Sequence, residues 1–334
     1  MPHIETYYTE KKNKKRFKAV VEVGGPENRK RKTKSFTKKG DASSWLAEVV
    51  SNKNQGYHID KSKITVGEQL DEWLRYKKST SRKTTYDRYK SKVEAHLKPE
   101  LGDIPLQELE PFHIENYLTK KRISGRKDGK KGGLKETTLK KHWVILNNML
   151  KKARKLKLIK FNPAEATECP KPQDYEAKYL DLNECSKLLK VTKNGNLMYY
   201  FIITLLFTGM RRSEILGLQW HNVNFEKEYI DIKEALLTSD NGYIHEPQVK
   251  SDKGKRRILM FKRLKPFLKE HKANQDNLRE EFQEEYNNDK NFVFCRPDGY
   301  PYHPNTYLKR FKKLIKKANL DNNINIHSLR HTFA

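Results

Sequence analysis

Cysteine is scarce in this sequence. Its 334 residues include three, Cys169, Cys185 and Cys295, which lie far apart and form no C-x-x-C pair. That spacing argues against a zinc site and a disulfide framework, and for a reducing compartment. Long apolar runs are also missing, since none approaches the ~20 residues needed to span a bilayer, and no signal peptide precedes the first charged residues. We therefore expect a soluble, cytoplasmic protein without a membrane partner.

Acidic residues are too few to balance the basic ones. The chain has 70 Lys and Arg against 42 Asp and Glu, a formal net charge of +28. Such an excess indicates a polyanionic partner, because Lys and Arg that meet phosphates release condensed counterions. A Lys-rich surface from an AT-rich genome is the plainer alternative. Charge alone separates neither DNA from RNA nor an enzyme from a passive binder.

Residues 1–58 are predicted to form a small β-sheet with one helix. Strands are expected at Arg16–Val23 and Arg29–Phe36, and helical spacing of apolar residues begins at Asp41. The second strand is charged on both faces and buries little, which suits insertion into a DNA groove. An ordinary basic surface hairpin is the alternative. The side chains expected to bind DNA are Arg29, Lys30, Arg31, Lys32 and Lys34.

Residues 63–168 are predicted to be all helical. A capping box, Thr65 with Glu68, opens the first helix, and Asn162-Pro163 ends the unit. Between them, apolar residues recur at helical steps with basic residues on the intervening faces. We interpret this domain as a clamp on a DNA duplex, although solvated helix faces would show the same charge pattern. Its expected DNA contacts are Arg82, Lys83 and Arg88.

Residues 176–334 are predicted to form a mainly helical domain with a small antiparallel sheet. An apolar run ends at Thr208-Gly209, and a second apolar run resumes after Arg211 and Glu214. Gly209 permits a sharp joint between the two runs. Arg211 and Glu214 stand three residues apart and therefore share one face of the helix that follows.

Three short antiparallel strands are predicted next, over Lys227–Ile232, Tyr243–Val249 and Arg256–Phe261. The last two flank a hairpin turn that contains Lys250. The sequence then ends in a helix start whose His327-x-x-Arg spacing puts both side chains on one side. The whole chain is thus predicted to be a multidomain α+β protein.

Two boxes give the last domain a specific likeness. The first is Thr-Gly-Met-Arg-Arg-Ser-Glu-Ile-Leu-Gly-Leu-Gln-Trp at Thr208–Trp220, and the second is His-Ser-Leu-Arg-His-Thr-Phe-Ala at His327–Ala334, with Lys250 between them. With these boxes the chain resembles a tyrosine recombinase of the phage and integrative-element integrase type. The likeness extends over essentially the whole chain, whose parts match that family's arm-binding, core-binding and catalytic domains.

The resemblance implies a site-specific recombinase that acts on attachment-site DNA in a bacterial host. It implies a tetramer on two duplexes, excision or host proteins as accessory partners, and no metal or cofactor. Glu214 matches the acidic residue that supports the family's first Arg, and His331 follows the second. Lys253 and Lys255 occupy the same turn as Lys250 and stay open as alternatives to it. The implied catalytic residues are Arg211, Lys250, His327 and Arg330.

Physical chemistry agrees with these roles. In transfer at a phosphodiester, negative charge grows on the non-bridging oxygens, and two guanidinium groups can hold it through bidentate hydrogen bonds. A lysine can protonate the departing 5′ oxygen, and a histidine can orient the phosphate and share the proton transfer. No clustered carboxylates of the two-metal type stand out.

One departure from the family pattern concerns the nucleophile. The family's tyrosine follows the His-x-x-Arg box by a few tens of residues, whereas the last of the 17 tyrosines here is Tyr307. Either the sequence is a fragment or a partner chain supplies the tyrosine, and we expect this chain by itself to bind DNA without cleaving it. The alternatives to a recombinase are a decayed integrase that only binds a DNA sequence and a basic RNA-binding protein, which would not explain the two boxes.

Overall fold

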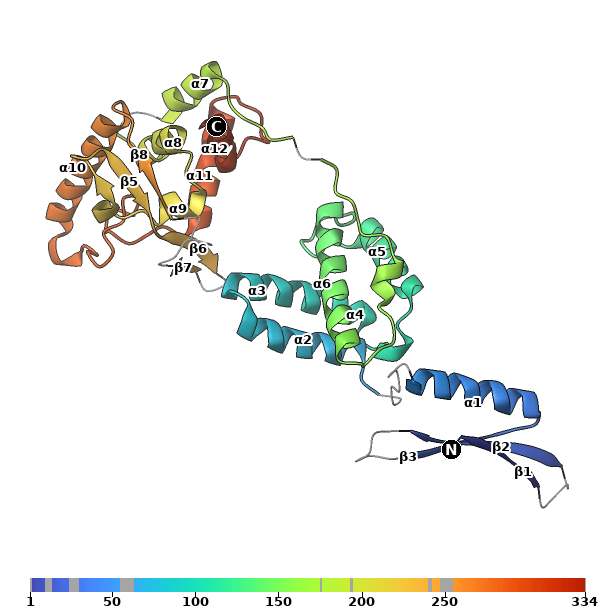
Figure 1. Ribbon diagram of the computed structural model, residues 1–334. Helices are drawn as coiled ribbons and strands as arrows, with labels where there is room; N and C mark the ends of the chain where they lie inside the picture. The colour runs from blue at the N-terminus through green and yellow to red at the C-terminus, as the bar shows by residue number, and fades with distance from the viewer. Residues whose placement is uncertain are drawn as a thin grey trace. The chain divides into compact units, whose positions relative to one another are not determined.

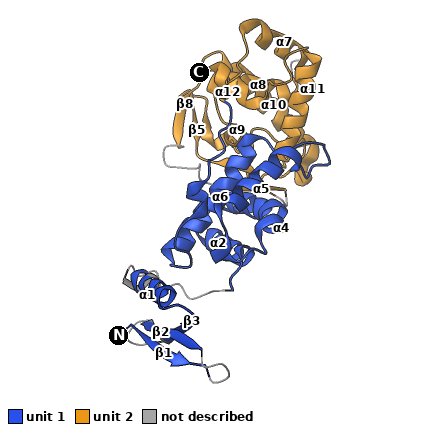
Figure 2. Ribbon diagram, turned by 90° about the vertical axis from the view of Figure 1, so that its right-hand side faces the viewer, with its two compact units in different colours: residues 1–173 blue, residues 174–334 orange. Residues whose placement is uncertain are grey.

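The chain forms two compact units, Met1–Gln173 and Asp174–Ala334, coloured blue and orange in Figure 2. The computed structural model describes residues 2–9, 14–23, 30–54, 63–174, 176–192, 195–239, 242–246 and 255–333. Helices dominate these residues, together with small antiparallel sheets (Figure 1), so the predicted α+β class is confirmed. The first unit contains both the predicted sheet domain and the predicted helical domain. No helix in the described ranges is long and apolar enough to cross a membrane.

A three-stranded sheet and one helix form the N-terminal part. Strands β1 (His3–Tyr8), β2 (Lys15–Val23) and β3 (Lys30–Phe36) pair antiparallel in that order, and helix α1 (Lys39–Asn54) packs on β2. No described side chain of β3 is buried, as its charge pattern predicted. Strand β1 was not predicted, because none of its side chains is buried and it shows no apolar alternation. The buried apolar side chains here are Ala19, Val20, Val21 and Ala42.

The rest of the first unit is helical. The Thr65 hydroxyl accepts a hydrogen bond from the Glu68 backbone N–H at 3.2 Å, and the Thr65 N–H donates to the Glu68 carboxylate at 2.8 Å, so the predicted capping box is confirmed. The helices are α2 (Val66–Thr80), α3 (Lys83–Lys92), α4 (Lys98–Leu101), α5 (Pro111–Ser124) and α6 (Glu136–Lys155). Shorter turns are η1 (Val93–Leu97, π-helical), η2 (Leu106–Glu108) and η3 (Pro163–Ala166).

A buried histidine lies in the core of these helices. His142 on α6 is fully buried, its Nδ1 lies 2.8 Å from the Tyr117 hydroxyl, and its ring centroid lies 4.9 Å from that of His96. Burial, together with the positive charges of His96, Lys92 and Lys121, lowers the pKa of His142 to about 3. The folded protein therefore keeps a neutral imidazole that the unfolded chain protonates near pH 6.5.

We expect the first unit to lose stability as the pH falls from 7 to 5. Below pH 6.5 His142 is protonated in the unfolded chain, whereas in the folded protein it stays neutral down to its pKa of about 3. The free energy of unfolding therefore falls by about 2 kcal/mol at pH 5. Urea denaturation at the two pH values measures this loss. His142→Gln should reduce this pH dependence, of which His96, whose pKa burial also lowers, would retain a part. An equally steep dependence in that variant would contradict the assignment.

The second unit is built around the apolar helix α8 (Leu197–Thr208). In the described residues it packs against α7 (Leu182–Thr192), α10 (Leu264–Phe282), α11 (Pro304–Lys317) and α12 (Ile326–Phe333). A helix that is apolar on all sides is expected in a core rather than at a surface. The apolar run that precedes Gly209 in the sequence is therefore the centre of this unit.

Two small sheets complete the second unit. One contains β4 (Val223–Asn224), β5 (Tyr229–Ile232) and β8 (Arg256–Leu259), and the other contains β6 (Ala235–Ser239) and β7 (Gly242–Glu246). The predicted pairing of the two strands on either side of Lys250 was wrong in the described residues. Strand β7 pairs instead with β6, which precedes it closely in sequence and was not predicted, and β8 pairs with β5. The turn η4 (Trp220–Asn222) and helix α9 (Arg212–Leu216) precede these sheets, and the turn η6 (Gln283–Glu285) follows α10.

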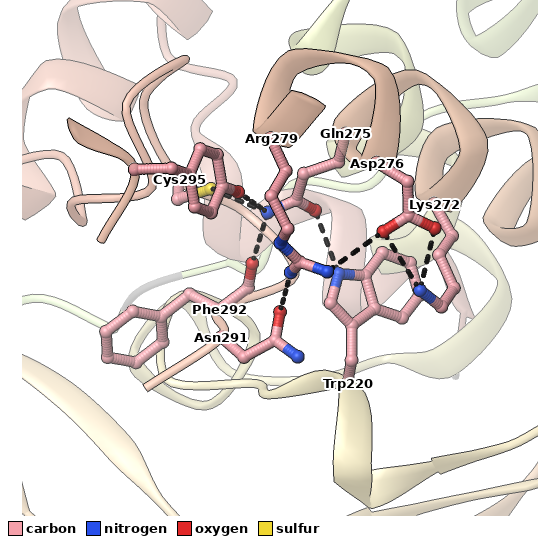
Figure 3. A network of polar contacts seen from close by, with 9 residues as sticks. Trp220, Lys272, Gln275, Asp276, Arg279, Asn291, Phe292 and Cys295 are labelled. Atoms are coloured by element: carbon pink, nitrogen blue, oxygen red, sulfur yellow. Dashed lines mark hydrogen bonds and ion pairs between the residues drawn. The ribbon is translucent and has the colours of Figure 1, made fainter. Parts of the chain in front are cut away.

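Gln275 of α10 joins three segments of the second unit in one buried network (Figure 3). Its carbonyl oxygen accepts a hydrogen bond from the Trp220 indole N–H at 2.8 Å. Its amide nitrogen lies 2.9 Å from the backbone carbonyl of Phe292 and 2.8 Å from the Cys295 sulfur. Because these polar groups are buried, the network replaces the water they have lost. It ties the end of the first box, Trp220, to α10.

We expect Gln275→Leu to destabilise the second unit. The indole N–H and the carbonyl of Phe292 would each lose a buried partner, at a cost of about 1 to 3 kcal/mol in the free energy of unfolding. Chemical denaturation followed by near-UV circular dichroism measures this cost. Glu280→Leu, at an exposed position of the same helix, is the control. Equal stability of Gln275→Leu and the wild type would show that the network contributes nothing.

Candidate active site

The junction between α8 and α9 places the first box at the edge of the core. Helix α8 ends at Thr208, and Gly209 adopts a left-handed conformation with φ +57°. Glycine takes this conformation without strain, and a Cβ at this position would lie 2.4 Å from the Phe333 ring of α12. The chain therefore turns sharply and brings Arg211 to the start of α9.

Arg211 and Glu214 bond to each other at that helix start. The Arg211 backbone N–H donates to Glu214 Oε2 at 2.8 Å, and its Nη1 donates to Oε1 at 2.6 Å. The Glu214 side chain is 2% exposed, whereas that of Arg211 is 54% exposed. A buried carboxylate thus holds an exposed guanidinium, and the two side chains meet on one face of α9, as their spacing of three residues predicted.

A second arginine shares the same carboxylate. Arg256, the first residue of β8, donates from Nη1 to Glu214 Oε1 at 3.1 Å and from Nη2 to Oε2 at 2.8 Å. Burial raises the pKa of Glu214, but the hydrogen bonds from Arg256 and Arg211 outweigh burial and lower it. Arg256 was not predicted, because it stands in a basic run in which no spacing rule separates it from its neighbours.

Helix α12 brings the second box to the same place. The Arg330 Nη1 donates to the backbone carbonyl of Gly209 at 2.6 Å, across 121 residues of sequence. Burial and the charges of Arg211 and Arg256 lower the pKa of Arg330, against the opposing effect of Glu214. The two arginines predicted to hold a phosphate therefore lie near each other.

Two histidines on α12 complete the arrangement. His327 and His331 contact edge to face, with ring centroids 4.7 Å apart. Burial, followed by the charges of His331, Arg330 and Arg211, lowers the pKa of His327. We call this set the arginine–histidine cluster: Arg211, Glu214, Arg256, His327, Arg330 and His331.

The segment that enters the second unit is attached to α12. The buried Leu180 donates its backbone N–H to the Thr332 hydroxyl at 2.9 Å. Lys178 forms an ion pair with Asp321, shortly before α12 begins. The helix that carries His327 and Arg330 is thus held by α8 and by this segment.

The remaining predicted site residues are not part of the cluster as described. Lys250, Lys253 and Arg29 fall outside the described residues, as does the side chain of Lys30, while Lys255 is exposed directly before β8. The other basic residues lie in the first unit: Arg31, Lys32 and Lys34 on β3, and Arg82, Lys83 and Arg88 exposed at or on α3. Across the part of the chain that the structure describes, no three His, Cys, Asp or Glu side chains gather so as to hold a metal ion.

We expect the His327 imidazole to titrate below the ordinary histidine pKa of 6.5 and to respond to Arg211. Arg211→Gln removes a positive charge from its surroundings, so the pKa of His327 should rise. Arg212→Gln is the matched control, because Arg212 is not among the groups that shift this pKa. A pH titration of the ring C–H signals by NMR measures both variants, and an equal rise in the two would contradict the geometry.

Two family models match this chain. One, described as the phage integrase family, matches residues 178–334, and the other, described as the N-terminal SAM-like domain of phage integrases, matches residues 65–122. A XerC-like tyrosine recombinase of Caldanaerobacter subterraneus subsp. tengcongensis is 26% identical over 97% of this chain and 85% of that protein. The transposase of transposon Tn916 from Enterococcus faecalis is 34% identical, over 43% of this chain and 36% of its own length.

Solved structures share the fold. The Tn1549 transposon integrase in complex with a circular intermediate DNA matches with a TM-score of 0.68 at 20% identity, over 81% of this chain and 85% of that one. The lambda integrase tetramer bound to a Holliday junction matches with a TM-score of 0.56 at 16% identity, over 98% of this chain and 86% of that one.

Proposed function

Because this chain belongs to the phage integrase family of tyrosine recombinases, we propose that it acts as a site-specific DNA recombinase on attachment sites. The observation that carries the proposal is the arginine–histidine cluster. Arg211 and Arg330 come from segments far apart in sequence, lie close to His327, and leave a guanidinium exposed. The two boxes that resemble the family supply every residue of the cluster except Arg256.

The proposed reaction is a transfer at one phosphodiester of each strand. A tyrosine oxygen attacks the phosphorus, a 3′-phosphotyrosyl bond forms and the bond to the 5′ oxygen breaks. The 5′ oxygen takes its proton from a lysine, for which we propose Lys250, with Lys253 and Lys255 as alternatives. Attack by the 5′ hydroxyl of another strand then releases the tyrosine and rejoins the DNA.

The cluster supplies the electrostatic part of this reaction. Arg211 and Arg330 hold the charge that grows on the non-bridging oxygens. His327 orients the phosphate and shares the proton transfer, while Glu214 and His331 support the groups beside them. Because Tyr307 is the last tyrosine of the sequence and lies before the second box, we assign the nucleophile to no residue of 1–334 and propose that this chain alone binds DNA without cleaving it.

The proposed partner is double-stranded DNA. The exposed basic side chains on β3 and α3 would contact its phosphates, with Arg29 and Lys30 extending the first set. We propose a tetramer in the synaptic complex, as for the lambda integrase tetramer on a Holliday junction. Excision or host proteins would act as accessory factors.

The test is a suicide substrate, a nicked duplex that carries the end sequence of the element encoding the protein. The protein expressed from its full reading frame should form a covalent DNA adduct, whereas residues 1–334 should only shift the duplex in a gel. Arg211→Ala should lower the rate of adduct formation by about 10²- to 10³-fold without a matching loss of DNA affinity. Binding without any adduct from the full reading frame would favour a decayed integrase, and preference for competing RNA would favour an RNA-binding protein.

A further inference from the structure

Arg256 binds Glu214 through two nitrogens of its guanidinium, whereas Arg211 binds it through one guanidinium nitrogen and its backbone N–H. Both terminal nitrogens of Arg256 reach it, one to each carboxylate oxygen, at 3.1 and 2.8 Å. Among the described residues the Arg211 side chain bonds to it through Nη1 alone, at 2.6 Å. Two parallel bonds from one guanidinium are the geometry that pairs best with a carboxylate. Arg256 is therefore the main counter-ion of this carboxylate.

The side chain of Arg256 is also less exposed to solvent than that of Arg211. The Arg256 side chain is 29% exposed and that of Arg211 is 54% exposed. The Glu214 carboxylate carries one negative charge and is shared by two guanidinium groups. Arg256 is the less exposed partner and bonds through two guanidinium nitrogens, so the guanidinium of Arg211 is the more exposed and less fully bonded of the two.

The backbone of Arg256 is also held in place. It pairs with Ile232 at the end of the β5–β8 ladder, and the next residue, Arg257, pairs with Asp231. The Arg257 side chain bonds to the Asp231 carboxylate at 2.8 and 3.2 Å and does not join the cluster. The strand thus presents two adjacent arginines with different partners, which provides an internal comparison.

We propose that Arg256 is a positioning residue for the recombination site: it neutralises Glu214 so that Arg211 keeps its orientation and its charge for a DNA phosphate. This inference rests on the proposed function. It assigns no contact between Arg256 and the substrate.

Removal of the Arg256 side chain should weaken the binding of phosphate by Arg211. In Arg256→Ala the buried carboxylate would retain a single counter-ion and draw Arg211 onto itself. The affinity of the cluster for inorganic phosphate should then fall by about tenfold or more. In a Glu214→Gln background there is no charge to compensate, so the same Arg256→Ala substitution should have little further effect.

The experiment is a double-mutant cycle on the isolated chain. Inorganic phosphate is titrated while the Nε–Hε signals of Arg211 and Arg330 are followed by NMR, in the wild type, Arg256→Ala, Glu214→Gln and the double variant. Arg257→Ala, on the same strand but paired with Asp231, is the matched control and should bind phosphate as the wild type does. Arg256→Lys keeps the charge without the bidentate geometry and should give an intermediate loss. If Arg256→Ala fails to fold, the cycle is run with Arg256→Lys.

The outcomes separate this inference from the proposed function. The positioning role would be overturned if Arg256→Ala left the phosphate affinity unchanged. It would also be overturned if Arg256→Ala lowered that affinity equally with Glu214 and with Gln at position 214, or if the wild-type cluster bound no phosphate. In the suicide-substrate assay with the protein expressed from its full reading frame, Arg256→Ala should lower adduct formation, with Arg257→Ala as control. If the wild-type protein from the full reading frame forms no adduct while the phosphate cycle shows coupling, the proposed function fails and the positioning role stands.

Discussion

A buried carboxylate shared by two guanidinium groups holds the arginine–histidine cluster together. Glu214 is 2% exposed, and a charge at that depth is tolerated only when it is paired and fully hydrogen-bonded. Its partners come from different parts of the fold, Arg211 from the start of α9 and Arg256 from the start of β8. The Glu214 carboxylate therefore links the first box to the small sheet, because its buried charge is paired by an arginine from each.

The α8–α9 junction decides where the second box lies. Gly209 leaves room for the Phe333 ring and offers its carbonyl to Arg330 at 2.6 Å. The left-handed conformation of Gly209 thus turns the chain towards Arg211. The same residue contacts α12, which carries Arg330 and His327. The hydrogen bond from the Leu180 backbone N–H to the Thr332 hydroxyl attaches α12 to the segment that precedes α7. The proposed use of Arg211 and Arg330 at one phosphate depends on this contact between α12 and the end of α8.

The first unit uses its charge differently. Its basic residues on β3 and α3 stay at the surface, while its cores are small or purely helical. Surface cations of this kind suit the proposed contacts with a phosphate backbone, because phosphate contacts position a protein without reading the DNA sequence. The buried His142 belongs to the core of the helices and has no part in that surface.

Much of this protein is determined by local sequence. The apolar run of α8, the capping box at Thr65 and the joint at Gly209 all follow from interactions between residues a few positions apart, which periodicity and capping rules describe. The two boxes likewise place Arg211 with Glu214 at one helix start and His327 with Arg330 at another, by their spacing alone.

Only the tertiary structure decided which segments meet. Strand β7 pairs with β6 and β8 pairs with β5, although the spacing around Lys250 predicted that β7 and β8 would pair. Arg256 and Arg257 are neighbouring arginines that no sequence pattern distinguishes, yet Arg256 bonds to Glu214 and Arg257 bonds to Asp231. Strand pairing and the partner of a charged side chain depend on packing between distant residues, so no local pattern could reveal them. The sequence by itself determined the helices and the boxes, and the packing of α12 and β8 against α9 made them one site.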